Sequence, residues 1–177
     1  KFHFGYHSVE QAKQNPGMVR AFERLKREGL VKHLAISQHH YNNIGGAMAC
    51  YHEALSCSKR RNQFDRPIPA YQMVQEKLAW MIREITKGQL LVLQLGRLKD
   101  QGKAKPHHVS LGKMNNVQVG LQCARLAREI LGANGITDEY QCGRHMCNLE
   151  SVYTYEGTHD IHTLVIGEAI TGIPAYK

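Results

Sequence analysis

The chain has 177 residues, which suits one domain or one domain and a fragment, and its formal net charge is +8. The charged residues are spread along the chain rather than clustered, which argues against a nucleic-acid-binding surface. No apolar run is long enough to cross a membrane. The five cysteines are an odd number without a CxxC pair, so we expect reduced thiols in a cytosol-like compartment.

Residues 1–42 differ in character from the rest of the chain. An aromatic-rich run at 1–7 is plausible as a strand, and residues 30–37 predict a second one. Between them, Pro16 can begin a helix that ends at Gly29. The order strand, helix, strand predicts a βαβ unit.

After Asn42 the sequence predicts helices and no further strands. The helices fall where apolar residues recur at helical spacing, over 44–61, 70–101, 107–131, 138–150 and 158–170. Gly88 interrupts the second pattern without an accompanying proline, so one long helix is preferred to two. Short connections between helices favour a mainly α fold, an antiparallel helical bundle preceded by a small α/β appendage. The expected domains are therefore 1–42 and 43–177.

The stretch from Tyr153 to His162 carries the most chemistry. Glu156 stands between an aromatic residue and a glycine, and Thr158 is placed to cap a following helix. A carboxylate in a tight turn with little side-chain bulk after it can reach into a pocket and take a proton. A simpler alternative is an acidic residue near a helix N-terminus, favoured by the helix dipole.

Two groups of His, Cys and Asp residues permit a metal-site interpretation. One is His159, Asp160 and His162, and the other lies within 142–147. Histidines on a helix surface are much commoner than ligands, so no metal site is predicted. The glycine-containing segment 131–135 follows a helix rather than a strand, so it is not a Rossmann fingerprint.

Four segments in unbroken order carry a family resemblance. They are Arg-Asn-Gln-Phe-Asp-Arg-Pro-Ile at 61–68, Leu-Gly-Arg-Leu-Lys-Asp at 95–100, Leu-Gly-Ala-Asn-Gly-Ile at 131–136, and residues 148–162 with 169–173. Residues 44–177 thereby resemble the C-terminal helical domain of acyl-CoA dehydrogenases, most closely that of glutaryl-CoA dehydrogenases.

The resemblance implies a reaction and its base. In that family a glutamate removes the α-proton of an acyl-CoA thioester while a hydride leaves the β-carbon for FAD, and Glu156 matches that glutamate. Its neighbours Tyr155 and Gly157 are assigned to substrate binding. A base of this kind works best where burial beside apolar groups and bound substrate bring its pKa nearer neutrality.

The resemblance also implies a set of cofactor contacts. An arginine among them is chemically sensible, because a guanidinium can pair bidentately with a pyrophosphate. The glycine-containing turn matches one that lies near the cofactor of a neighbouring subunit. The matching residues are Arg61 and Phe64, then Gly132, Ala133 and Gly135 of that turn, and finally Thr158 and Asp160. Two positions depart from the family: Asp65 replaces a glycine, and Cys142-Gly143 replaces apolar residues, so we expect a loosened helix start there.

The implied partners are an acyl-CoA, an electron-transferring flavoprotein and further copies of the chain, because family members are tetramers. In glutaryl-CoA dehydrogenases the unsaturated product loses carbon dioxide to give crotonyl-CoA. The expected compartment is the cytoplasm, or the mitochondrial matrix in a eukaryote. The chain lacks the family's N-terminal helical and middle β-domains, so the alternative is a non-catalytic helical oligomerisation fragment or a fusion product without turnover.

Residues 1–42 instead resemble a βαβ piece of an aldo-keto reductase barrel. His7 matches that family's active-site histidine, whereas the catalytic tyrosine, lysine and aspartate have no counterpart in this segment. One βαβ unit cannot close a barrel. We therefore expect no reductase activity.

Overall fold

The computed structural model describes residues 24, 27–28 and 43–176. The chain separates into two units, Lys1–His40 and Tyr41–Lys177. In the first unit Arg24 and Arg27 are helical, and Arg24 Nε donates to Glu28 Oε1 at 2.6 Å. His7 and both predicted strands lie outside the described residues, and so does the aldo-keto reductase interpretation that depends on them.

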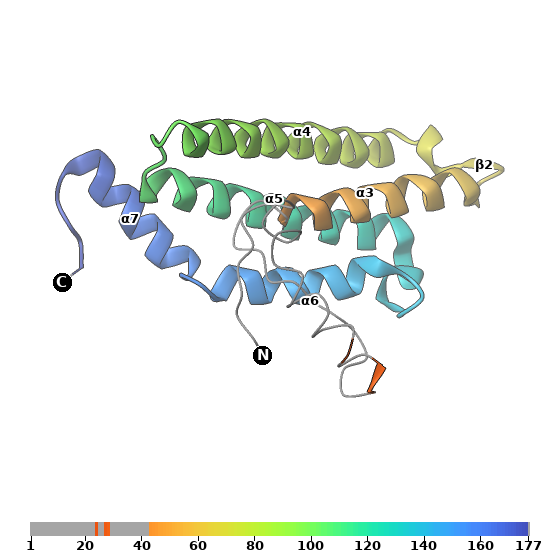
Figure 1. Cartoon of the computed structure of the whole chain (residues 1–177). Coiled ribbons are helices and arrows are strands. Elements are labelled where there is room, and N and C mark those ends of the chain that lie inside the picture. Colours follow the sequence, from red (N-terminus) through yellow and green to blue (C-terminus); the bar gives the residue numbers. More distant parts are fainter. Residues whose placement is uncertain (1–23, 25–26, 29–42, 177) are drawn as a thin grey trace. The chain divides into compact units, whose positions relative to one another are not determined.

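The second unit is the predicted helical bundle. In residues 43–176 its helices are α3 (Asn43–Arg60), α4 (Gln72–Asp100), α5 (Pro106–Leu131), α6 (Gln141–Thr154) and α7 (His159–Thr171). Figure 1 shows α4 along one side of α5 and α6 along the other, with α3 beside α5. Because α5 contacts each of the other four helices, it is the central helix of the unit. None of the described helices is both long and apolar enough to span a membrane.

The long helix α4 is continuous through Gly88, as predicted. A Cβ at this position would lie 2.5 Å from Cδ1 of Ile44 and 2.9 Å from Oδ1 of Asn116. The glycine therefore allows α3 and α5 to approach α4 closely, and this packing offsets its low helix propensity. The predicted apolar stripe is also present, since Leu78, Met81 and Ile85 are buried.

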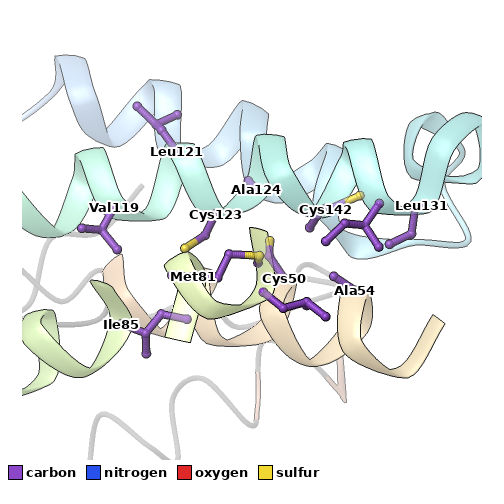
Figure 2. Close-up of a cluster of buried hydrophobic side chains, with 14 of the residues drawn as sticks. Cys50, Ala54, Met81, Ile85, Val119, Leu121, Cys123, Ala124, Leu131 and Cys142 are labelled. Carbon is purple, nitrogen blue, oxygen red and sulfur yellow. The ribbon is translucent and has the colours of Figure 1, made fainter. Parts of the chain in front are cut away.

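The core is rich in sulfur. Figure 2 shows Cys50 of α3, Met81 of α4 and Cys123 of α5 side by side in the middle of the bundle. All five cysteines are free thiols, as the sequence predicted, and of these Cys147 alone is exposed. Burial raises the pKa of both Cys50 and Cys123 to about 12, so these thiols stay protonated and pack as small apolar groups.

Two details differ from the sequence prediction. Strands do follow Asn42, because Asn62–Gln63 (β1) and Arg66–Pro67 (β2) form a short antiparallel hairpin in which Gln63 pairs with Arg66. Its two loop residues, Phe64 and Asp65, have φ angles of 50° and 62°. Both positions of a type I′ turn are left-handed, which explains how Asp65 serves where the family has glycine.

Helix α6 was predicted over 138–150 but runs from Gln141 to Thr154. Its start is fixed from another helix, because the Glu53 carboxylate of α3 accepts hydrogen bonds from the backbone nitrogens of Gln141 and Cys142 at 2.9–3.1 Å. Cys142 is fully buried, and its Sγ lies 3.2 Å from the carbonyl oxygen of Gly135. The expectation of a loosened start at Cys142-Gly143 is therefore wrong.

Candidate functional site

The residues assigned to function fall into two groups at opposite ends of α5. Lys113, near the start of α5, contacts the turn that carries Glu156, and Leu131, at its end, contacts Arg61. These two points on α5 are about 27 Å apart at about 1.5 Å of rise per residue. Figure 1 shows the hairpin at one end of the bundle and the α6–α7 junction towards the other. One chain therefore does not bring the two groups together.

Glu156 lies in the tight connection between α6 and α7. Its φ angle is 57° and that of Gly157 is 92°, so both are in the left-handed region. For a residue with a Cβ this conformation costs about 1–2 kcal/mol, and it persists only where the surroundings impose it. The turn therefore holds Glu156 in a strained backbone conformation, a feature that is concentrated at functional sites.

Lys113 supplies the contacts that hold this turn. Its Nζ donates to the carbonyl oxygens of Tyr155 and Gly157, the residues on either side of Glu156, each at 2.5 Å. Burial lowers the pKa of the Lys113 ammonium group, and the nearby Glu156 carboxylate acts in the opposite direction. The sequence analysis did not single out Lys113. Its position on the stripe of α5 that buries Val117 and Ala124 indicates an inward-facing lysine, but the turn that it contacts can be identified only in the folded chain.

Tyr155 and Glu156 are both exposed within this chain. Tyr155 retains 45% of its accessible surface, and its ring centroid is 5.9 Å from the Nζ of Lys113. Burial and the Glu156 charge together raise the pKa of Tyr155, which keeps the phenol protonated. Glu156 is exposed among the described residues, so the expected burial has to come from bound substrate or from other protein parts.

Gly157 is required by close packing. A Cβ at this position would lie 2.9 Å from Cε1 and Nε2 of His162. The His162 ring is held from the other side by Ser110, whose Oγ is 3.0 Å from Nδ1. Nε2 is buried against Gly157 without hydrogen-bond geometry to any described residue. Burial, reinforced by the Lys113 charge, lowers the pKa of His162, so the ring is neutral near pH 7.

The start of α7 fixes the other side of the turn. Thr158 is the N-cap, and its Oγ1 accepts a hydrogen bond from the Ile161 nitrogen at 3.2 Å. Asp160 is exposed in the first turn of α7. His159 stacks on Tyr153 with ring centroids 4.6 Å apart. In the part of the chain that is described, no group of three or more His, Cys, Asp or Glu side chains is arranged to hold a metal ion.

The second group combines Arg61 with the turn after α5. Arg61 Nη1 donates to the Leu131 carbonyl at 3.2 Å, and a Cβ on Gly132, whose φ is 65°, would lie 3.3 Å from the same nitrogen. A Cβ on Gly135 would lie 2.8 Å from both Cα and O of Arg128, so only glycine fits there. Two further members of the group are exposed: Ala133 in the turn, and Phe64 at the hairpin tip with 88% exposure.

A separate open cleft of about 620 Å³ lies between α4, α5 and α6. Its walls include Trp80, Gln118 and Tyr153, together with Arg125 and Glu150, which form an ion pair at 3.2 Å. None of the residues assigned to function lines this cleft. It is therefore distinct from both groups.

Comparison with known proteins identifies a family model and solved structures that are similar to this chain. A family model described as "Acyl-CoA dehydrogenase, C-terminal domain" matches residues 38–171. A solved glutaryl-CoA dehydrogenase from Mycobacterium smegmatis is 53% identical, with a TM-score of 0.75 over 76% of this chain and 35% of that one. A structure of a glutaryl-CoA dehydrogenase from the same species in complex with FADH2 is 46% identical, with the same TM-score of 0.75 and the same coverage of 76% and 35%.

A relative found by sequence is also a glutaryl-CoA dehydrogenase. Glutaryl-CoA dehydrogenase from Desulfococcus multivorans is 32% identical over 124 residues, which are 70% of this chain and 32% of that protein. The chain thus spans about a third of the length of the proteins it matches.

Proposed function

The chain belongs to the acyl-CoA dehydrogenase family, and we propose that it is the C-terminal helical portion of an FAD-dependent enzyme that oxidises an acyl-CoA thioester. The observation that carries the proposal is the conformation of Glu156. This residue matches the family's base, and its turn is strained and held on both sides by Lys113. A carboxylate on an exposed turn whose backbone Lys113 holds supports the role of base. The helix-dipole alternative gives no reason for the strained backbone at Glu156, and the N-cap of α7 is Thr158.

In the proposed reaction an Oε of Glu156 takes the α-proton of the thioester. FAD, when bound, would supply the acceptor for the hydride of the β-carbon, and the product would be an α,β-unsaturated thioester. Tyr155 and Gly157 flank the base and would contact the acyl chain. Substrate and cofactor would also cover the exposed Glu156 carboxylate and exclude water from it.

The Arg61 group fits a phosphate-bearing cofactor. A guanidinium has five donors, and the structure gives Arg61 one hydrogen bond among the described residues. Gly132 carries no side chain beside the Arg61 guanidinium that would obstruct the approach of a pyrophosphate, and the ring of Phe64 at the hairpin tip is exposed. Thr158 and Asp160 would contact the flavin from the Glu156 turn.

The distance of about 27 Å between the two groups supports assembly of several copies. A cofactor beside Glu156 would then receive its pyrophosphate contacts from the Arg61 group of another copy. We propose a homo-oligomer, a tetramer by family resemblance. Reoxidation of the flavin would require an electron-transferring flavoprotein.

Glutaryl-CoA is the proposed substrate, supported by the identity to the mycobacterial glutaryl-CoA dehydrogenase. After oxidation, the distal carboxylate of the product would leave as carbon dioxide. The carbanion that remains would take up a proton to give crotonyl-CoA.

Flavin absorbance tests this proposal. The chain, purified and incubated with FAD, is expected to become yellow and to lose its flavin absorbance when glutaryl-CoA is added. Glu156→Gln should abolish this loss without changing helicity. The matched control Glu150→Gln, on the exposed surface of α6, should lose its flavin absorbance as the unchanged chain does. Protein that takes up no flavin would instead support a non-catalytic helical fragment.

A further inference from the structure

We propose that Lys113 is a positioning residue that fixes the direction of the Glu156 carboxylate by holding the carbonyl oxygens on both sides of it. The inference rests on the proposed function for what Glu156 does. The role of Lys113 in holding the turn does not depend on that function, because it rests on the two hydrogen bonds that Lys113 donates to the turn.

The turn is anchored at both of its ends. It joins the last turn of α6, where the Tyr155 nitrogen donates to Ser151, to the Thr158 cap of α7. Between these points Glu156 and Gly157 are both left-handed, a conformation that Glu156 does not adopt by preference. Contacts with the turn offset the cost of this conformation, and Lys113 supplies two of them.

Lys113 has the chemistry for this task. An ammonium group carries three donors and no acceptor, and two of these donors reach the carbonyls of Tyr155 and Gly157. Its stem is half-buried on the inward stripe of α5, so the charged end cannot swing freely in solvent. The Tyr155 carbonyl belongs to the peptide unit directly before Glu156, and the Gly157 carbonyl belongs to the unit that joins Gly157 to Thr158. Holding both carbonyls restrains the short segment from which the Glu156 side chain projects.

A second contact supports the same turn. Ser110, one helical turn before Lys113 on α5, holds the His162 ring against Gly157. The groups that face the turn from α5 and α7 are thus Ser110, Lys113 and His162, while His159 stacks on α6. The ring limits how far Gly157 can move, and the Gly157 backbone acts in turn on the pKa of His162, in the direction opposite to burial.

A merely structural role for Lys113 makes a different prediction. If Lys113 only joined α5 to α7, its removal would lower global stability and leave the reaction of the folded protein unchanged. Lys77 is a matched control, because it is a half-buried lysine whose Nζ pairs with Glu129 Oε2 at 2.7 Å, far from the turn.

Hydrogen exchange of the 177-residue chain tests the holding role. In Lys113→Met, the amides of residues 155–162 should exchange about 10- to 100-fold faster, as expected from losing hydrogen bonds to a charged group. Lys113→Arg, which keeps a charged donor, should restore most of the protection. Lys77→Met should leave these amides unchanged. If Lys113→Met does not fold, the shorter neutral Lys113→Gln replaces it. Unchanged exchange in the folded variant would overturn the proposal.

The flavin-loaded protein tests the positioning role. At saturating glutaryl-CoA, Lys113→Met should lose flavin absorbance about 10- to 100-fold more slowly, with a half-saturating concentration changed less than about threefold. Lys113→Arg should recover part of the rate. Faster exchange combined with an unchanged rate would show that Lys113 holds the turn without aiming the base, which overturns the proposal. A wild-type chain that binds FAD but is not bleached would remove the proposed function, and the exchange data would still decide whether Lys113 holds the turn.

Discussion

Replacing Gly157 by alanine should damage both the stability and the chemistry of the Glu156 turn. The φ angle of 92° is one that an L-residue adopts only with strain. The new Cβ would lie 2.9 Å from two atoms of His162, and that ring cannot retreat freely because Ser110 holds its Nδ1 at 3.0 Å. The conformational cost is about 1–2 kcal/mol, and crowding adds a further amount of the order of 1 kcal/mol.

The expected loss is thus about 2 kcal/mol or more, which corresponds to a fall in Tm of roughly 4–8 °C for a chain of this length. Gly167→Ala in α7 is the matched control. Its Cβ would meet nothing within 4 Å, so the same chemical change should raise stability by about 0.5–1 kcal/mol. Thermal unfolding followed by circular dichroism measures both variants. Gly157→Ala melting at the wild-type temperature, with unaltered flavin bleaching, would refute the account of how this turn is built.

Two further predictions concern titratable groups. In the folded chain Cys147 should react promptly with a thiol reagent, and the other four thiols should react only after unfolding in urea. The reason is that those four are buried, and burial raises the pKa values of Cys50 and Cys123. Prompt reaction of several thiols in the folded chain would contradict this. Burial lowers the pKa values of His145 and His162, so the unfolded chain binds more protons and stability should fall as the pH drops below about 6.5. Urea midpoints at pH 7.5 and 5.5 measure this loss of stability, and the loss should be smaller in His162→Gln. An equal loss of stability in that variant would show that His162 does not contribute to it.

The helices could be predicted because their information is local. The stripe of Leu78, Met81 and Ile85 repeats with the helical period, and Gly88 lacks the proline that would have ended the helix. The start of α6 could not be predicted in this way. It depends on Glu53, which is 88 residues away in the sequence, and no pattern around Gln141 reveals that contact.

The candidate site shows the same limit. The Tyr155-Glu156-Gly157 motif could be found from the sequence because three residue types stand together. The lysine that holds it comes from α5, more than 40 residues earlier, and needed the folded chain to be recognised. The hairpin was missed because strands of two residues are too short to show an alternating pattern.

The central claim is that Glu156 removes a proton from the α-carbon of an acyl-CoA. The most direct measurement uses the FAD-loaded chain in deuterium oxide with a CoA thioester whose β-position carries no hydrogen to transfer. Mass spectrometry of the recovered thioester should show deuterium entering the α-position with the wild-type chain and with Glu150→Gln. The rate should fall at least about 100-fold in Glu156→Gln. Equal rates in Glu156→Gln and the wild-type chain would contradict the claim.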